Sequence, residues 1–200
     1  MKIYTRRGDD GTTGLLGGAR VAKADPVVEL NGTLDEAQAF LGLARAECTP
    51  GEALDEVLVG VERDLWVVMG ELALGGDAGE GLRASLPSVT EDMVTALEAR
   101  IDEATAGLDL ERGFAVPGDN RRSAALDVAR AVVRRAERLA SALPGCPPVA
   151  LAYLNRLSDL CWALARSSET AHRVQRRPAP GEPAAPPEAQ RLDDVRKEPT

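Results

Sequence analysis

The sequence predicts an all-α fold: a five-helix up-and-down bundle that follows an N-terminal glycine-rich loop. Apolar residues recur at helical spacing in five segments, and glycine- or proline-containing connections separate these segments. Hydrophobic residues make up 44% of the 200 residues but aromatic residues only 3%, so the core must consist mainly of Leu, Val and Ala. Such a core suits packed helices better than a sheet sandwich, and modest connections favour antiparallel neighbours.

The first 24 residues show no helical period and are predicted to be loop or extended chain. Closely spaced glycines let backbone amides approach phosphate oxygens, threonine hydroxyls add donors, and arginine adds charge-assisted bonds. The segment lacks the P-loop pattern, and its composition fits a flexible N-terminus equally well. The candidate phosphate ligands are Thr5, Arg6, Arg7, Gly8, Asp9, Gly11, Thr12 and Thr13.

Three helices are expected in the first half of the chain. The first runs from about Pro26 to residue 47, with proline in its first turn. The second spans about 52–74 and ends at the glycines of 75–81. The third follows Thr90, whose side chain can cap it, and stops at Gly107.

The fourth helix carries four arginines within residues 127–138 and closes before Pro144 and Gly145. At about 100° per residue, Arg130, Arg134 and Glu137 lie together along the edge of its apolar face. Partly burying like charges is costly without a partner, so a bound anion is one explanation. A solvated face with pairs between side chains three residues apart is the other.

The fifth helix is expected from Pro148 to about residue 172, and its Asn155 and Asp159 share one face among leucines. Polar groups near a core must be satisfied or functional. The chain is predicted to form one domain over residues 1–175, of which 1–24 is the lead. Residues 176–200 are rich in proline and alanine and are predicted to be a disordered tail.

Two further side chains stand out by their setting. Asp35 lies within a Gly-Thr-Leu-Asp step of the first helix, where it is either an ordinary surface carboxylate or faces an arginine of the fourth helix. Phe114 occupies a loop bounded by glycine and proline, where an aromatic ring either caps the bundle core or lines a site.

Charge and composition exclude several classes of function. A net charge of −8 argues against general binding to nucleic acid or to anionic membranes. No apolar run reaches about 18 residues and no signal segment is evident, so we expect a cytoplasmic protein. Three cysteines without a Cys-x-x-Cys pair, and a single histidine, predict free thiols and no metal site built by the protein.

Six segments in order resemble the ATP:corrinoid adenosyltransferases of the trimeric, propanediol-utilisation type. They are YTRRGDDGTT, GARVAK, NGTLDE, FAVPG, ARAVVRRAER and YLNRLSDLCWALAR, and the likeness runs from Lys2 to about Glu169. The resemblance implies a homotrimer of five-helix bundles with each active site between neighbouring subunits. It also implies transfer of the 5'-deoxyadenosyl group of ATP to the cobalt(I) of cob(I)alamin or a related corrinoid, with Mg²⁺ and release of triphosphate.

The resemblance assigns roles to individual residues. Asp35 would pair with Arg134 across the subunit boundary, and Phe114 would pack under the corrin ring. Arg130 and Arg134 would stabilise the charge that gathers on the triphosphate. The implied nucleotide ligands are Thr5, Arg6, Gly8, Asp9, Gly11, Thr12, Thr13, Lys23, Arg130, Arg134, Glu137 and Asn155.

The chain departs from the family pattern at five positions. Asp10 stands where lysine is common and Asn31 where an aromatic residue is usual; Arg7, Asp119 and Asn120 are the others. Two alternatives remain beside the enzyme: a non-catalytic trimer that carries or senses ATP or corrinoid, and a helical interaction module. A reductase and an adenosylcobalamin-dependent enzyme are possible partners of the enzyme.

Overall fold

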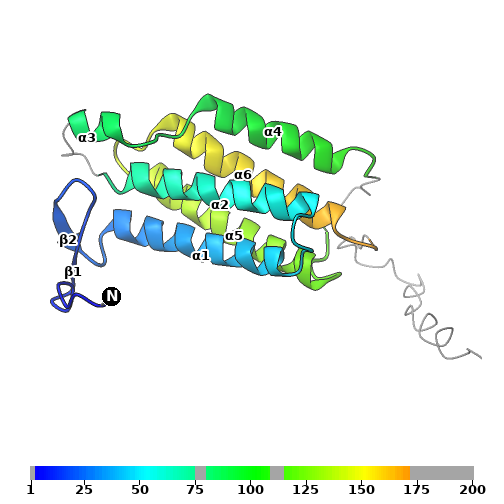
Figure 1. Cartoon of the computed structure of the whole chain (residues 1–200), viewed down its shortest axis with the longest axis horizontal. Helices are drawn as coiled ribbons and strands as arrows, with labels where there is room; N and C mark the ends of the chain where they lie inside the picture. The colour runs from blue at the N-terminus through cyan, green and yellow to red at the C-terminus, as the bar shows by residue number, and fades with distance from the viewer. Residues whose placement is uncertain (1–2, 75–79, 109–114, 172–200) are drawn as a thin grey trace, which may run out of the picture.

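A computed structural model describes residues 3–74, 80–108 and 115–171. Five long helices form an antiparallel bundle, which confirms the all-α prediction (Figure 1). They are α1 (Pro26–Ala46), α2 (Ala53–Leu72), α4 (Glu91–Thr105), α5 (Arg121–Ala142) and α6 (Pro148–Ser167). The sequence reading placed the end of the last helix near residue 172, whereas α6 ends at Ser167.

Two small elements were not predicted as such. A short helix, α3 (Glu80–Ser85), precedes α4, and it buries none of its residues, so it lacks the apolar stripe by which a helix is recognised in a sequence. Strands β1 (Thr12–Gly14) and β2 (Arg20–Ala22) form an antiparallel hairpin within the N-terminal lead, with Thr13 opposite Val21. Each strand has only three residues, which is too few to show the alternation of apolar and polar residues by which a strand is recognised.

Side-chain caps begin three of the helices. The carboxylate of Asp25 accepts a hydrogen bond from the Val27 amide at 2.9 Å at the start of α1. The hydroxyl of Thr90 accepts one from the Met93 amide at 3.3 Å, which confirms the predicted cap of α4. At α5, Asn120 and Ser123 form a reciprocal capping box, which satisfies amides that the first turn leaves without helical partners.

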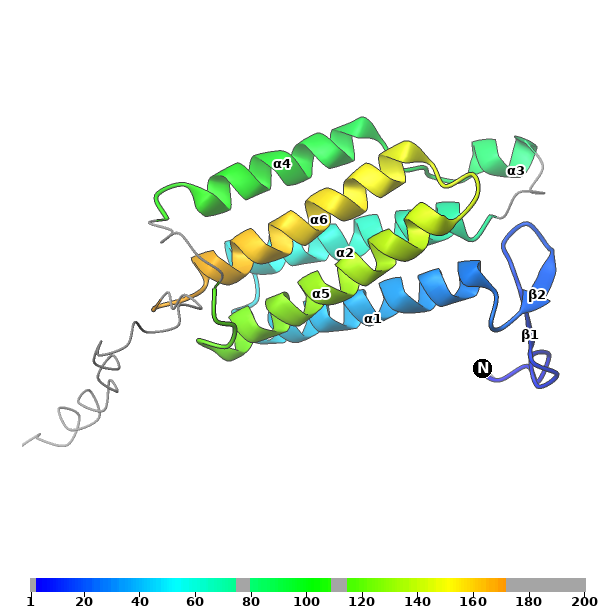
Figure 2. The same ribbon diagram turned by 180° about the vertical axis from the view of Figure 1, so that it is seen from behind.

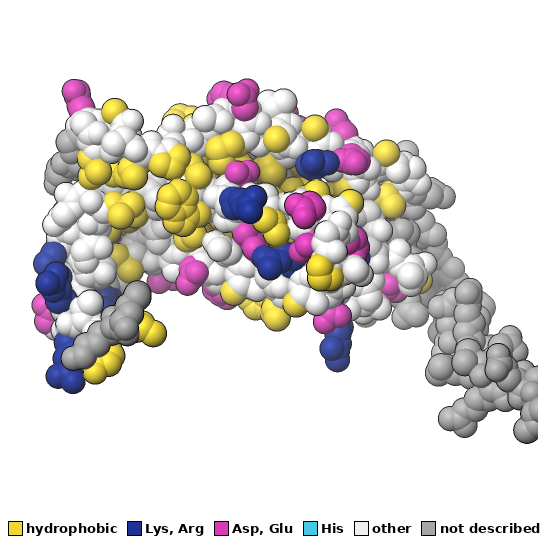
Figure 3. Space-filling model, viewed as in Figure 1, with side chains coloured by type: hydrophobic (Ala, Val, Ile, Leu, Met, Phe, Trp, Pro, Cys, Tyr) yellow, Lys and Arg dark blue, Asp and Glu magenta, His cyan; other side chains and the backbone are white. Residues whose placement is uncertain are grey.

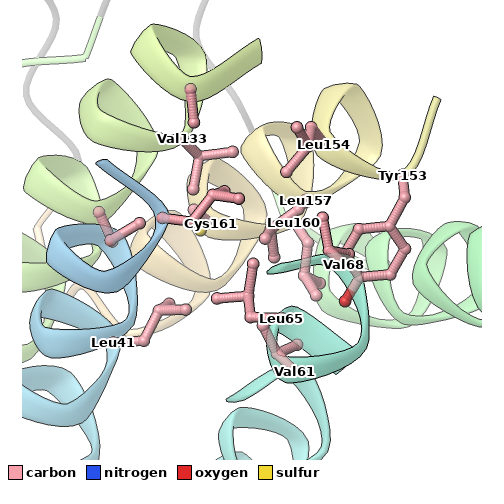
Figure 4. Packing of buried hydrophobic residues seen from close by; sticks show 14 of the residues in the cluster. Leu41, Val61, Leu65, Val68, Val133, Tyr153, Leu154, Leu157, Leu160 and Cys161 are labelled. Atoms are coloured by element: carbon pink, nitrogen blue, oxygen red, sulfur yellow. The ribbon is translucent and has the colours of Figure 1, made fainter. Parts of the chain in front are cut away.

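The core lies between α1, α2, α5 and α6, with α4 on the outside. Helix α1 packs against α5 and α2, while α6 packs against α5 and α4 (Figure 2). Leucine and valine from these helices interdigitate in the interior, as Figure 4 shows for Leu41, Leu65 and Val133. This agrees with the low aromatic content. Tyr153 is fully buried, and its hydroxyl donates a hydrogen bond to Asp64 of α2 at 3.1 Å.

The hairpin lies beyond the end of the bundle at which α1 begins (Figures 1 and 2). A hydrogen bond of 3.1 Å from the Leu16 amide to the Ala73 carbonyl ties its tip to the residue that follows α2. Gly18 has a φ of 87° in the turn between the strands, a conformation that favours glycine. The hairpin is therefore a separate projection that the bundle holds at one end.

At the opposite end of the bundle, the two residues before α5 join it to the end of α6. The side-chain Nδ2 of Asn120 donates a hydrogen bond to the Ser168 carbonyl at 2.7 Å. The carboxylate of Asp119 accepts bonds from the amide and hydroxyl of Thr170 at 2.9 and 3.1 Å, and these bonds lower its pKa. These two departures from the family pattern thus have a structural role.

Among the described helices, none combines the length and apolar character needed to cross a membrane. The predicted tail, residues 176–200, lies outside the described residues, as does Phe114.

Replacing Asn120 with alanine should lower the free energy of unfolding by about 1–2 kcal/mol, because the change removes a helix cap and a bond to α6. The measurement is urea unfolding followed by far-UV circular dichroism. Arg121→Ala, which truncates a side chain that is 88% exposed, is the control and should leave the midpoint unchanged. Equal midpoints for both variants would contradict the assignment.

Candidate functional site

The N-terminal lead folds into a compact turn held by Asp10. Its carboxylate accepts hydrogen bonds from the amide and hydroxyl of Thr12, at 3.0 and 2.8 Å. Arg20 from strand β2 lies 3.5 Å from the same carboxylate, contacts the Thr12 hydroxyl, and donates to the Arg7 carbonyl at 2.7 Å. The bonds from Thr12 are the main cause of the lowered pKa of Asp10. The negative charge of Asp10 is therefore engaged by the hairpin itself.

Gly8 and Lys23 bring the two ends of the lead together. A Cβ on Gly8 would lie 3.0 Å from the Thr12 carbonyl oxygen and 3.3 Å from Lys23 Cε, so only glycine fits here without a shift. The Lys23 amide donates to the Gly11 carbonyl at 2.9 Å. The structure thus gathers Gly8, Gly11, Thr12 and Lys23 around one turn, with a lysine ammonium beside exposed backbone.

The other predicted lead residues lie at the rim of this turn. Arg6 has a φ of 61°, rare for a residue other than glycine, and its guanidinium lies 5.5 Å from the ring centroid of Tyr4. Thr5 accepts a hydrogen bond from the Arg7 amide at 3.4 Å. Asp9 is exposed and Thr13 is half-buried in β1. Thr5, Arg6 and Asp9 thus remain exposed around the turn.

Helix α5 presents Arg130 at the edge of its buried face, as its period predicts. The side chain of Arg130 is 34% exposed, and its Nε lies 3.7 Å from Asp127 Oδ1, too far for a hydrogen bond. No described residue accepts a hydrogen bond from its terminal nitrogens. This arginine is therefore partly desolvated, with its donor pair open to a ligand.

Glu137 and Asn155 lie against each other across α5 and α6. The Asn155 amide donates to Glu137 Oε1 at 2.8 Å, and the Asn155 oxygen accepts from Arg156 at 2.7 Å. Arg156 in turn bonds to Glu98 of α4 at 2.9 Å, which raises the pKa of Arg156. Asp159, on the same face, is 3.6 Å from Arg156. The structure thus brings together two predicted nucleotide ligands and fixes their orientation.

Asp35 and Arg134 do not pair within the chain. Both side chains are exposed on the adjacent helices α1 and α5, and neither has a hydrogen-bond or ion-pair partner among the described residues. The ion pair that does join these helices is Glu36 with Arg135. The predicted pair of Asp35 with Arg134 is therefore not formed within one chain.

The two groups of candidate residues do not meet in one chain. From Thr5 to Ala24, no described hydrogen bond or ion pair connects the lead to α5 or α6, and the hairpin lies beyond the end of the bundle (Figure 1). Arg130 lies in the first half of α5, whose first turn is at the opposite end. Within one chain, the described contacts therefore do not join the lead to Arg130.

One surface cavity of about 650 Å³ is lined by Glu52, Arg100, Arg122 and Ser167 among others, and contains none of the predicted site residues. A second, apolar groove of about 320 Å³ includes Leu16 and Asn31. Apolar side chains gather in this part of the face shown in Figure 3. Asn31 there bonds to the Val27 carbonyl of its own helix at 3.1 Å.

Sequence reasoning missed Arg20, which holds the lead turn, and Arg166, which bonds to Asp127. Asp127 itself lies beside Arg130, as expected for a pair of side chains three residues apart. For Asp127 and Arg166 a signal existed, because both fall within the apolar stripes of their helices, where a charge needs a partner. Among the described residues, no group of three or more His, Cys, Asp or Glu side chains could hold a metal ion.

Replacing Asp10 with alanine should weaken binding of MgATP severalfold, because the turn loses its bonds to Thr12 and Arg20. The measurement is titration calorimetry. Glu29→Ala removes the same charge from an exposed site on α1 and should leave the affinity unchanged. Tighter binding by the Asp10 variant would mean that repulsion between Asp10 and the phosphates outweighs its structural bonds.

Comparison with known proteins identifies the family. A family model described as cobalamin adenosyltransferase matches residues 3–168. The corrinoid adenosyltransferase of Bacillus subtilis is 40% identical over 172 residues, which cover 83% of this chain and 86% of that protein. A corrinoid adenosyltransferase of Citrobacter freundii is 39% identical over 172 residues, covering 84% of this chain and 96% of that protein.

A solved structure shares the fold. It is a variant of the PduO-type ATP:corrinoid adenosyltransferase from Lactobacillus reuteri, complexed with cobalamin and ATP. It superposes with a TM-score of 0.81 at 29% identity, covering 88% of this chain and all of that one. With its motifs in order and its arginine-bearing helix placed as described, this chain belongs to the cobalamin adenosyltransferase family.

Proposed function

We propose that this protein transfers the 5'-deoxyadenosyl group of ATP to the cobalt(I) of a corrinoid, giving adenosylcobalamin and triphosphate. The observation that carries the proposal is Arg130, half-buried at the edge of α5 with its terminal nitrogens open. A partly desolvated arginine with a free donor pair is suited to bidentate binding of phosphate oxygens. The family relationship supplies the identity of the substrates.

The reaction asks the protein mainly to bind and to stabilise charge. Cobalt(I) attacks the 5'-carbon, the new Co–C bond forms as the C5'–O bond breaks, and the electron pair leaves with the triphosphate. Arg130, Arg134 and Lys23 would stabilise that negative charge more strongly as it develops. Mg²⁺ would enter as part of the MgATP substrate, since it prefers phosphate oxygens and water. No protein nucleophile is needed.

The active site is proposed to lie between two subunits of a homotrimer. The lead of one subunit would hold ATP with Thr5, Arg6, Gly8, Asp9, Gly11, Thr12, Thr13 and Lys23. Helices α5 and α6 of a neighbour would add Arg130, Arg134, Glu137 and Asn155. Two observations support this arrangement. The lead and Arg130 are apart within one chain, and the exposed side chains of Asp35 and Arg134 have no partner among the described residues, which leaves them free to pair across the boundary.

Phe114, outside the described residues, is proposed to pack beneath the corrin ring, where an apolar group would displace the lower axial ligand and ease reduction to cobalt(I). The electron would come from a separate reductase, and the product would serve an adenosylcobalamin-dependent enzyme. Cys48, Cys146 and Cys161 are free thiols, which fits a reducing compartment and so a cytoplasmic location.

Arg130→Ala should abolish turnover while leaving the oligomer intact, because it removes a phosphate ligand whose charge stabilisation strengthens as the triphosphate leaves. The assay is anaerobic reaction of chemically reduced cob(I)alamin with MgATP, following loss of the cobalt(I) spectrum and formation of triphosphate. Arg63→Ala, at an exposed position of α2, is the control with the same charge change. Wild-type turnover in the Arg130 variant would overturn its role. Ligand binding by the wild type without either product would indicate a carrier.

Mixing two inactive variants should restore activity if the site is shared. Lys23→Ala damages the lead, Arg130→Ala damages α5, and each homotrimer should be nearly inactive. After subunit exchange, some interfaces contain an intact lead from one subunit and an intact α5 from another, so part of the activity should return. The control is a mixture of Arg130→Ala with Arg134→Ala, both on α5, which should stay inactive. Failure of the first mixture would place the whole site within one chain.

A further inference from the structure

Arg156 of α6 belongs to a row of four hydrogen-bonded side chains that joins three helices. Its Nη1 donates a hydrogen bond of 2.7 Å to Asn155 Oδ1, and its Nε donates one of 2.9 Å to Glu98 of α4. Asn155 in turn donates to Glu137 of α5 at 2.8 Å. Helix α6 lies between α4 and α5, so the row connects both of its neighbours (Figure 2). Glu137 and Asn155 are predicted nucleotide ligands, whereas Arg156 and Glu98 lie outside that set.

The chemistry of its two partners fixes the direction of the Asn155 amide. A side-chain amide has a donor end and an acceptor end, a guanidinium only donates, and an ionised carboxylate only accepts. With the oxygen toward Arg156 and the NH₂ group toward Glu137, both contacts are attractive. A flipped amide would set two donors against each other at Arg156 and two acceptors against each other at Glu137. Without Arg156, only one of the two contacts would hold the amide in this direction.

The contact between Asn155 and Arg156 does not follow from helix geometry. Side chains of consecutive residues leave a helix in different directions, so they do not face each other by default. Two carboxylates hold the guanidinium in place: Glu98 accepts from its Nε, and Asp159 lies 3.6 Å from its Nη1. From this position Nη1 meets the Asn155 oxygen. A role in orienting Asn155 therefore accounts for a contact that the helix itself does not require.

Two further features distinguish the row from a structural clip. The side chains of Arg156 and Glu98 are 39% and 50% exposed, and ion pairs at such positions contribute little to folding because water and salt screen them. At the other end of the row, the second oxygen of Glu137 and the second N–H of Asn155 have no hydrogen-bond partner among the described residues. The row therefore ends in one acceptor and one donor that a ligand can use.

We propose that Arg156, anchored by Glu98, is a positioning residue that fixes the direction of the Asn155 amide, and with it the Glu137 carboxylate, for the nucleotide. Arg156 acts through Asn155 and does not itself touch the nucleotide. The inference rests on the proposed function in one respect, that Glu137 and Asn155 contact ATP.

The competing explanation is that Arg156 only joins α4 to α6. In that case Arg156→Met, which removes every hydrogen-bond donor of the side chain, should lower Tm and leave the Kd of the folded protein for MgATP unchanged. If Arg156 positions Asn155, Tm should change little and Kd should rise. Arg100→Met is the matched control, because it removes the same charge from an exposed ion pair with Glu103 of α4 and should change neither value.

The test is titration calorimetry with MgATP on the full chain, with kcat and KM from the cob(I)alamin assay and Tm for every variant. Arg156→Met should raise the Kd for MgATP about tenfold, or about 1.4 kcal/mol, which is the size of one hydrogen bond. Because cations stabilise the charge on the leaving triphosphate, the loss should appear in the KM for ATP and leave kcat unchanged. A wild-type Kd, or a loss confined to kcat, would overturn the proposal.

A double-mutant cycle shows whether Arg156 acts through Asn155. In an Asn155→Ala background, Arg156→Met should have almost no further effect on Kd, because the amide that it orients is gone. Equal effects in both backgrounds would mean that Arg156 acts on the nucleotide independently, which contradicts the proposal. Glu98→Ala removes the anchor but leaves Arg156 in place, so it should also raise Kd; an unchanged Kd would refute the part assigned to Glu98. If Arg156→Met does not fold, Arg156→Gln takes its place in the same measurements.

The binding data separate this inference from the proposed function. A wild type that binds MgATP without turnover refutes the transferase but leaves the effect of Arg156 on Kd measurable. A wild type with full turnover whose Arg156→Met variant keeps the wild-type Kd refutes only the inference about Arg156.

Discussion

The packing of α5 is the constraint on which the rest of the structure depends. This helix contacts both α1 and α6, and its small and branched residues Ala129, Val133 and Ala136 are fully buried between them. A helix packed on two sides has only a narrow strip left at its edge. That strip carries Arg130, Arg134 and Glu137, so the helix that forms the centre of the bundle also displays the charges that would act on a substrate.

The arginines at this edge of α5 differ in their exposure and in their ion-pair partners. Arg130 is half-buried beside Asp127, and Arg135 is paired with Glu36 of α1, whereas Arg134 is exposed and unpaired among the described residues. One arginine thus lies beside a carboxylate of its own helix, one joins two helices and one is exposed to solvent. The four arginines of the segment look alike in the sequence, and their surroundings give them different tasks.

The β1–β2 hairpin, beyond the end of the bundle at which α1 begins, is stabilised differently from the helices. It is built from short-range bonds, with Asp10, Thr12 and Arg20 within one small loop, and a single backbone bond joins it to the residue after α2. The hairpin is therefore anchored to the bundle, but the helices of the same chain do not shield it from solvent. This leaves backbone amides and the Lys23 ammonium accessible, and it fits a site that two subunits complete together. The departure at Asp10 becomes understandable here, because its charge is engaged by the loop.

The sequence by itself determined the long helices and the face that each buries, because a period of 3.6 residues and local signals, such as Pro148 at a helix start and Gly107 after a helix end, are written in neighbouring residues. It also indicated Arg130 and Arg134 as edge residues, and the ordered motifs indicated the family. It could not reveal α3, which buries nothing, or strands of three residues. Only the tertiary structure decided which side chains meet. Asp127 with Arg166, Glu36 with Arg135 and Asn120 with Ser168 are far apart in the chain, and such pairs depend on how helices are placed and rotated against one another, which no local pattern encodes.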